Sequence, residues 1–119
     1  MMVKRTRFLC GLMVSQLLSL NHAFASPQQE IDHLLTFVES TQCKYERNGT
    51  IHNGPEAAAH IKKKADYYAD DIESAEDFIA YSATKSMLSG RHYRVHCEGK
   101  ASVSSEVWLK SELDDFRSR

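Results

Sequence analysis

Downstream of residue 25, hydrophobic positions recur first with the spacing of a helix. One face of this segment is apolar at the i, i+3, i+4 and i+7 positions, which are occupied by Ile31, Leu34, Leu35 and Val38. Ser26 is suited to cap the start of a helix, and Gln29 follows three residues later, as in a capping box. The pattern therefore predicts a helix from Ser26 to about Ser40.

A β-hairpin is predicted over residues 42–52, where the helical spacing gives way to alternation. The Asn48-Gly49 pair at its centre favours a tight turn, because both residues tolerate a positive φ. A strict two-residue loop would place the apolar Ile51 on the face of Glu46, away from the apolar face of the hairpin. Either a bulge therefore shifts the register, or the second strand is very short.

Two further helices are predicted in the middle of the chain. The first opens at residues 53–56, and its apolar side consists of Ala57, Ala58, Ile61, Ala65 and Tyr68. The lysine run at residues 62–64 spans about 200° of this helix, so we interpret it as solvated surface and not as a phosphate-binding stripe. The second helix begins at Ser74 with acidic residues in its first turn and extends toward Gly90, which suits a helix stop.

The C-terminal third of the chain predicts a strand and a last helix. Residues 91–98 alternate between two faces, one with Tyr93, Val95 and Cys97 and the other with His92, Arg94 and His96. This alternation is typical of a half-buried strand. After a connection over residues 99–104, Ser105 is suited to cap a helix whose apolar residues are Trp108, Leu109, Leu113 and Phe116.

The first 25 residues have the three parts of a secretory signal peptide. A positive segment at residues 4–7 precedes an apolar run over residues 8–20, and Ala23 and Ala25 supply small residues at −3 and −1 of a cut before Ser26. The apolar run has about 13 residues, whereas a membrane span needs roughly 20. We therefore expect a leader that is cleaved after Ala25, and a product that works outside the cytoplasm without stable membrane insertion.

Processing is expected to leave residues 26–119 as a small, mildly acidic single domain with two cysteines. Three of the 15 Lys and Arg residues precede the cut and all 16 acidic residues follow it, so the formal net charge changes from −1 to −4. This charge argues against a nucleic-acid partner and against binding to an anionic membrane. Outside the cytoplasm, Cys43 and Cys97 are expected to form a disulfide, and two free thiols are the competing interpretation.

The predicted order of elements is α-β-β-α-α-β-α, an α+β fold. A bond between Cys43 and Cys97 would bring the first and last strands together, because the Cα atoms of a disulfide lie within about 7 Å of each other. We expect a small three-stranded antiparallel or mixed sheet. About four helices are expected to pack on the sheet face that carries Tyr45, Tyr93 and Val95.

Metal and catalytic chemistry find little support in the sequence. His92 and His96 share a strand face but lie about 13 Å apart at strand rise, too far to bind one metal ion together. Neither cysteine has a partner Cys or His at zinc-ligand spacing. The sequence lacks the Gly-x-Ser-x-Gly elbow that presents a nucleophilic serine. Serines such as Ser86 are expected to cap helices or to pack between them. The alternative is a small Ser/His hydrolase, in which one serine lies beside His60. We expect no metal, no cofactor and no enzymatic activity.

Polar residues from three segments are candidates for a ligand or partner site: Arg47, Asn48, His60, Lys64, Ser89 and Tyr93. The first two lie at the tip of the predicted hairpin. The next two share a helix face one turn apart. The last two flank the predicted corner between a helix and a strand. The alternatives are that all six converge on one cleft, or that they make separate structural hydrogen bonds.

Four spaced motifs extend over nearly the whole processed chain: Cys43-x-Tyr45-x-Arg47-Asn48-Gly49, Ala58-x-His60-Ile61-x-x-Lys64, Ser74-Ala75-Glu76-Asp77-Phe78-Ile79 and Ser86-x-x-Ser89-Gly90-x-x-Tyr93-x-Val95-x-Cys97. Together they resemble the YfeK-like family of short exported proteins of Gram-negative bacteria. The resemblance implies a periplasmic location. It implies no activity and no particular catalytic or binding residue.

A shorter segment, Ser89-Gly90-Arg91-His92-Tyr93, is similar to the Ser-Gly-x-x-Tyr loop of periplasmic lysozyme inhibitors. A hydroxyl on such an exposed loop can occupy the carboxylate-lined cleft of a lysozyme. Those inhibitors are all-β barrels, whereas this chain is rich in helix patterns. The competing interpretation is a glycine helix stop followed by a buried strand tyrosine.

The expected location, the expected disulfide and the lack of a catalytic set together favour a non-enzymatic periplasmic domain. We expect it to bind a protein partner or a small ligand through the six polar residues named above. Lysozyme inhibition and Ser/His hydrolysis are the two alternatives.

Overall fold

The computed structural model describes residues 24–119, so the predicted leader lies outside the described residues except for its last two positions. Over this range the chain has an α+β fold, as predicted. Its elements follow in the order α1 (Pro27–Glu39), β1 (Lys44–Arg47), β2 (Thr50–His52), α2 (Gly54–Tyr67), the short 3-10 helix η2 (Ala69–Asp71), α3 (Ala75–Ser82), β3 (Arg94–His96), β4 (Val103–Ser104) and α4 (Ser105–Arg117).

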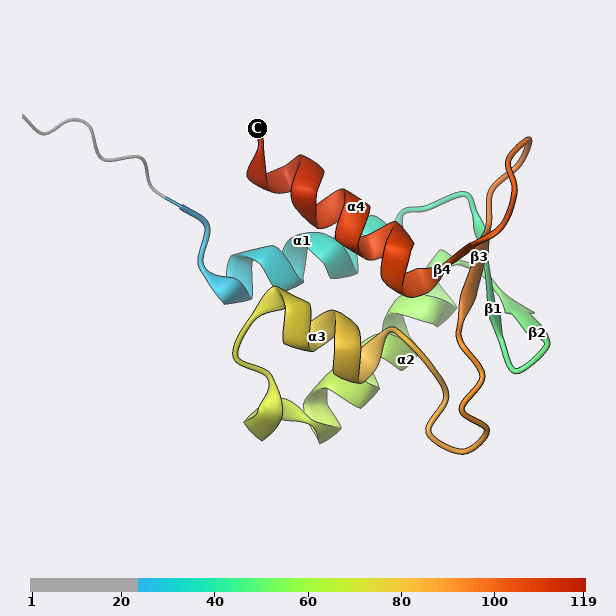
Figure 1. Ribbon diagram of the computed structural model, residues 1–119, viewed down its shortest axis with the longest axis horizontal. Coiled ribbons are helices and arrows are strands. Elements are labelled where there is room, and N and C mark those ends of the chain that lie inside the picture. Colours follow the sequence, from blue (N-terminus) through green and yellow to red (C-terminus); the bar gives the residue numbers. More distant parts are fainter. Residues whose placement is uncertain (1–23) are drawn as a thin grey trace, which may run out of the picture.

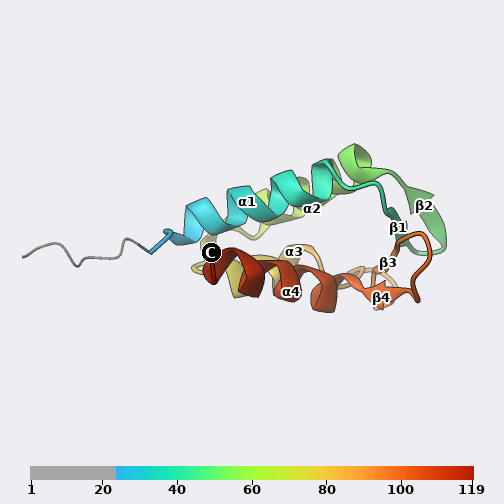
Figure 2. The same cartoon turned by 90° about the horizontal axis from the view of Figure 1, so that it is seen from above.

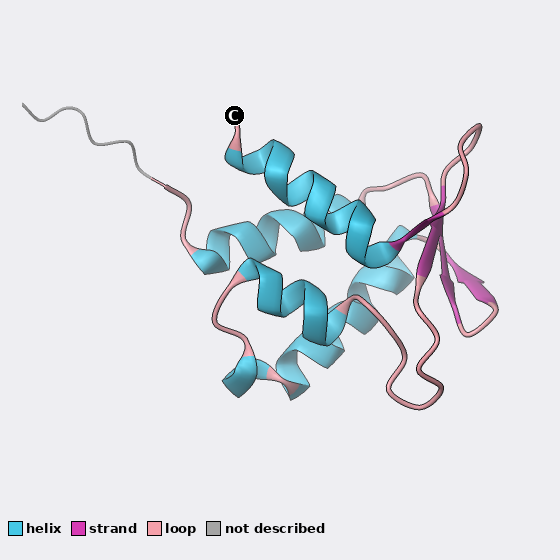
Figure 3. Cartoon of the chain, in the orientation of Figure 1, coloured by secondary structure: helices cyan, strands magenta, loops and turns pink. Residues whose placement is uncertain are grey.

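The helices form two layers, and the sheet lies across one end of them. Figure 2 shows α1 and α2 in one layer and α3 and α4 in the other. The strands gather beside the start of α2 (Figure 1; magenta in Figure 3). The core between the layers includes six large side chains that are at most 2% exposed: Leu34, Ile61, Phe78, Ile79, Leu109 and Leu113.

The first two helices begin where the sequence predicts. Ser26 Oγ accepts a hydrogen bond from the Gln29 backbone N–H at 3.1 Å, and the Gln29 side-chain oxygen accepts one from the Ser26 N–H at 2.8 Å. Asn53 and Glu56 form the same capping box at the start of α2. Gly54 is required at this junction, because a Cβ there would lie 2.6 Å from a backbone carbonyl oxygen of α1.

The sheet has four antiparallel strands in the order β2-β1-β3-β4, so the prediction of three strands is wrong. The additional strand, β4, consists of Val103 and Ser104 and pairs with β3. Two residues are too few to produce an alternating pattern, so the sequence cannot distinguish β4 from a connection. The central strand β3 is also shorter than predicted and covers only Arg94–His96.

The hairpin keeps the strict two-residue register. Glu46 lies opposite Ile51, and the turn residues Asn48 and Gly49 have φ values of 52° and 80°. Positive φ at both positions is typical of the turn that matches the twist of a hairpin. Ile51 is consequently 52% exposed on the face of Glu46, and β2 has only three residues. Of the two alternatives, the very short second strand is confirmed.

The third predicted helix is wrong in its second half, because α3 ends at Ser82 and not near Gly90. Thr84 Oγ1 donates a hydrogen bond to the Ile79 carbonyl at 2.8 Å, and the Ser82 hydroxyl donates to a carbonyl of the preceding turn. Side chains of this kind compete with the continuation of a helix. Residues 83–93 form a loop instead, called the 83–93 loop below.

The last helix begins one residue earlier than predicted. Ser104 caps α4, since its hydroxyl accepts a hydrogen bond from the Val107 N–H at 3.2 Å. Ser105, the predicted cap, is completely buried and its hydroxyl is hydrogen-bonded to the Tyr45 hydroxyl. Burial raises the pKa of Tyr45 far above its ordinary range. The pair therefore stays neutral and satisfies its own hydrogen bonding inside the core.

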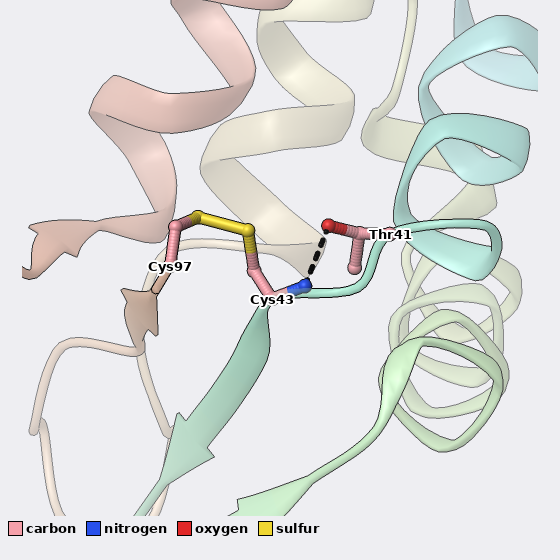
Figure 4. The surroundings of a disulfide bond; sticks show 3 residues. All are labelled: Thr41, Cys43 and Cys97. Carbon is pink, nitrogen blue, oxygen red and sulfur yellow. Dashed lines mark hydrogen bonds between the residues drawn. A yellow bond between two sulfur atoms is a disulfide. The ribbon is translucent and has the colours of Figure 1, made fainter. Parts of the chain in front are cut away.

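The predicted disulfide joins Cys43 and Cys97 beside the central pair of strands (Figure 4). Their Cα atoms are 4.4 Å apart although the two residues are separated by 54 positions. Thr41 Oγ1 accepts a hydrogen bond from the Cys43 N–H at 3.1 Å, which fixes the chain between α1 and β1. β1 and β3 pair directly beyond the bond, with Tyr45 opposite Val95, and both side chains are buried. The predicted core face of the sheet is thus confirmed. The prediction that about four helices pack on this face is wrong, because α2 and α4 contact β1 and β3 whereas α1 and α3 pack mainly on other helices.

Replacing both cysteines with serine (C43S/C97S) is expected to lower the free energy of unfolding by about 4 kcal/mol, because the bond restricts a loop of about 55 residues in the unfolded chain. Urea denaturation followed by circular dichroism measures the change, and the reduced wild-type protein is the matched control. A difference below about 1 kcal/mol between the oxidised protein and the variant would contradict this role of the bond.

Candidate functional site

A cavity of about 400 Å³ opens between the β1–β2 turn, helix α2 and the 83–93 loop. We call it the turn-loop cavity, and its volume lies within the range of small-molecule sites. Its lining comes from all three segments: Arg47, Asn48, His60, Lys63, Lys64, Tyr67, Tyr68, Ser86, Met87, Leu88 and Tyr93. These segments are far apart in the sequence and meet because β1 pairs with β3.

The structure brings the six predicted site residues together. Five of them line the turn-loop cavity: Arg47, Asn48, His60, Lys64 and Tyr93. The sixth, Ser89, lies outside the lining, but its hydroxyl donates a hydrogen bond to Asn48 Oδ1 at 2.6 Å. Five of the six make structural hydrogen bonds, in one group with Asn48 and Ser89 and another with His60, Lys64 and Tyr93. With Arg47, the two groups form a polar cluster around one cavity.

Tyr93 forms the floor of the cavity. Its ring is buried in the core, with its centroid 6.1 Å from that of Tyr45. Its hydroxyl accepts a hydrogen bond from Lys64 Nζ at 3.0 Å and lies 3.4 Å from His60 Nε2. Lys64 Nζ also donates to the Lys85 carbonyl oxygen at 2.7 Å. Tyr93 thus connects the core with the polar cluster, and Lys64 fastens α2 to the 83–93 loop.

Ser86 ties the 83–93 loop to the hairpin turn. Asn48 Nδ2 donates a hydrogen bond to Ser86 Oγ at 3.2 Å. The backbone N–H groups of Leu88 and Ser89 donate to the same oxygen at 3.2 and 3.3 Å. Because Ser86 is buried and its oxygen receives all three bonds, the loop has a defined conformation at the edge of the cavity.

Positive charge is concentrated around the cavity without carboxylate partners. Its described lining contains no acidic residue. Arg47, Lys63 and Lys64 form no ion pair with any residue from 24 to 119, whereas Lys62 pairs with Asp66 at 3.5 Å. Arg47 is half-buried, and its guanidinium donates no hydrogen bond within the same range. Such a surface attracts anions.

Burial and neighbouring cations change the titration of the groups at the floor. Burial, together with the charges of Arg47 and Lys64, lowers the pKa of His60 to about 4. Burial and the charge of Arg47 also lower the pKa of Lys64, and burial raises the pKa of Tyr93. At neutral pH, His60 is therefore uncharged and Tyr93 keeps its proton. The charge of the cavity comes from its lysines and Arg47.

The described residues offer little for catalysis at this cavity. The hydrogen-bond partner of His60 is Tyr93 and not a serine. The Ser86 hydroxyl is occupied by Asn48 and by the backbone of the loop. Within residues 24–119, no group of three or more His, Cys, Asp or Glu side chains is arranged to hold a metal ion.

Comparison with known proteins identifies the family but no function. Residues 25–117 match DUF5329, a family of unknown function. The chain belongs to this family. No curated protein and no solved structure matches it. The matched range contains both cysteines of the disulfide and every residue that lines the cavity, so the cavity is part of the DUF5329 domain. In the described part of the domain, no helix is both long and apolar enough to cross a membrane.

The sequence-based prediction does not include the apolar residues of the turn-loop cavity. Tyr67, Tyr68, Met87 and Leu88 all contribute to the lining. The periodicity puts Tyr68 on the core side of its helix and the Met-Leu pair inside a predicted helix, so nothing indicates that they meet. Lys63 was expected to be solvated surface, and it is exposed, but it also borders the cavity. No signal in the sequence marks Met87 and Leu88 as exposed, because apolar side chains of this size are most often buried.

The pKa of His60 provides a direct test of this site. In an NMR titration of the folded protein, the imidazole is expected to titrate with a midpoint of about 4. Lys64→Met is expected to raise this midpoint, because the variant removes one neighbouring positive charge. Lys62→Met is the matched control and should leave it unchanged, since Lys62 pairs with Asp66. A wild-type midpoint near the ordinary value of about 6.5 would contradict the described surroundings of His60.

Proposed function

We propose that this protein is a non-enzymatic binding module whose turn-loop cavity takes a small anionic ligand. One observation carries the proposal: Arg47, Lys63 and Lys64 surround a cavity of about 400 Å³ whose described lining contains no carboxylate. Partial burial of positive charges without a counter-charge is unfavourable, and a bound anion offsets that cost. The ligand therefore carries a phosphate or carboxylate group.

The donors around the cavity suit such a group. The planar fork of Arg47 matches two oxygens of a phosphate or carboxylate. Lys64 has three donors, of which two are used by Tyr93 and by the Lys85 carbonyl, so one is left for a ligand. The Tyr93 hydroxyl accepts from Lys64 and keeps its own O–H to donate to His60 or to the ligand. Because all three side chains line the same cavity, we expect a single anion to contact them together.

An exported, periplasmic location accompanies the proposed role. The charged, apolar and small-residue parts of residues 1–25 support cleavage before Ser26. A bond between Cys43 and Cys97 suits an oxidising compartment. The motifs that resemble the YfeK-like family imply the same location, in Gram-negative bacteria. We therefore expect the ligand to be a phosphorylated or carboxylated compound of the periplasm.

The two alternative functions find less support in this geometry. Lysozyme inhibition through the Ser-Gly-x-x-Tyr segment needs the tyrosine side chain on an exposed loop, whereas Tyr93 is 1% exposed. Hydrolysis needs a serine beside His60, but the hydroxyl of Ser86 is held by Asn48 and the loop backbone. A small ligand is also favoured over a protein partner as the occupant of the inner cavity, because Arg47 and Lys64 are half-buried there.

Calorimetric titration with butyl phosphate tests anion binding. We expect saturable binding at low ionic strength that weakens as salt is added. Arg47→Ala and Lys64→Met are each expected to weaken it at least about tenfold, because a hydrogen bond to a charged group contributes about 1.5–3 kcal/mol. Lys100→Met is the matched control, since Lys100 is exposed and does not line the cavity.

Equal affinities of the wild type and of both cavity variants would contradict the proposed site, as would the absence of saturable binding. NMR gives an independent measure of where the anion lies. Butyl phosphate bound in the cavity is expected to raise the pKa of His60, because a nearby negative charge favours the imidazolium. Binding that leaves the His60 titration unchanged would place the anion elsewhere on the protein.

A further inference from the structure

Exposed apolar side chains gather at the mouth of the turn-loop cavity. Tyr67 is 79% exposed, Met87 65% and Leu88 99%, although all three contribute to the lining. Single exposed apolar residues are common on protein surfaces, but three around one opening form a patch. Tyr68 connects them, because its ring centroid lies 4.9 Å from that of Tyr67 and its hydroxyl donates to Met87 Sδ.

The exposure of Met87 and Leu88 follows from the backbone of the loop that carries them. The Ser86 N–H donates a hydrogen bond to the Arg91 carbonyl at 3.0 Å, and the Gly90 N–H donates to the Ser86 carbonyl at 2.9 Å. With the bonds to Ser86 Oγ, these contacts hold the two apolar side chains away from the core. Leu88 buries almost no surface in the described fold, so its apolar area is available to a ligand.

The cavity is therefore cationic where it is buried and apolar where it opens. Building on the anion-binding role above, we propose that the ligand is a single-chain anionic amphiphile. Its phosphate or carboxylate group lies against Arg47 and Lys64. Its aliphatic chain leaves the cavity along Tyr67, Met87 and Leu88. A head group with a short alkyl chain suits the cavity volume of about 400 Å³, and the remainder of the chain covers the exposed patch.

Other anionic ligands match this distribution less well. The hydroxyl and amide groups of a sugar phosphate or a nucleotide need hydrogen-bond partners, whereas Met87 and Leu88 offer apolar contact at the mouth. An anionic bilayer is also disfavoured as the surface that covers the exposed apolar side chains. Asp70 and Asp71 are exposed and follow Tyr67 within four residues, and their charges would be repelled by anionic head groups. The charge pattern thus favours the free monomer as the source of the amphiphile.

A homologous series of alkyl phosphates tests recognition of the chain. Ethyl, butyl, hexyl and octyl phosphate are titrated by calorimetry below their micelle concentrations. Each added methylene is expected to tighten binding about twofold to fourfold, which corresponds to partial or full burial of a CH₂ group. Leu88→Ser and Tyr67→Ser are expected to reduce this gain per methylene, so that each variant loses more affinity for octyl phosphate than for ethyl phosphate. Val107→Ser is the matched control, because Val107 is an apolar residue of α4 that is 59% exposed outside the cavity.

The outcomes separate the amphiphile from anion binding in general. If the wild type binds all four phosphates with equal affinity, the proposal of an amphiphilic ligand is overturned and the proposal of an anion site stands. If it binds none of them, both proposals are overturned. If the protein binds phosphatidylglycerol vesicles and its affinity for the alkyl phosphates does not depend on chain length, the patch is assigned to a bilayer. This result also overturns the proposal of an amphiphilic ligand. Circular dichroism verifies that the variants fold, as expected for substitutions at exposed positions.

Discussion

The antiparallel pairing of β1 with β3 is the constraint on which the rest of the structure depends. It joins the first hairpin to the C-terminal third of the chain across α2 and α3, through only three residue pairs. At one end of this ladder, the Cys43–Cys97 bond extends the connection covalently. At the other end, the same pairing brings the Asn48-Gly49 turn against the 83–93 loop and so forms the turn-loop cavity. The stability of the fold and the geometry of its site have a common origin.

Tyr93 contributes both to the core of the fold and to the proposed binding site. Its ring belongs to the core, and its hydroxyl holds Lys64 at the floor of the cavity. Burial, together with the nearby positive charge of Arg47, lowers the pKa of Lys64. Groups with shifted pKa values and no structural counter-charge occur preferentially at functional sites. The surrounding sheet and helices make this unfavourable arrangement possible, and a bound anion would relieve it.

Local signals in the sequence were sufficient for much of the fold. Ser26 and Asn53 cap helices as predicted, and the tight turn follows from two residues that tolerate positive φ. Strand β4 was not predictable, because two residues become a strand only through pairing with β3. The end of α3 depends on the hydrogen bond from Thr84, which competes with an otherwise continuous helical pattern. That error also concealed the loop with Met87 and Leu88, so the sequence indicates most of the polar lining of the cavity but not its apolar mouth.

Native-state hydrogen exchange of the oxidised protein tests the central role of the β1–β3 pairing most directly. We predict that the hydrogen-bonded amides of β1 and β3 exchange only through global unfolding and rank among the slowest in residues 24–119. Their rates should rise together with those of the helices when denaturant is added. Exchange of these amides by local opening, while the amides of α1 and α4 remain protected, would contradict the dependence of the fold and the cavity on this pairing.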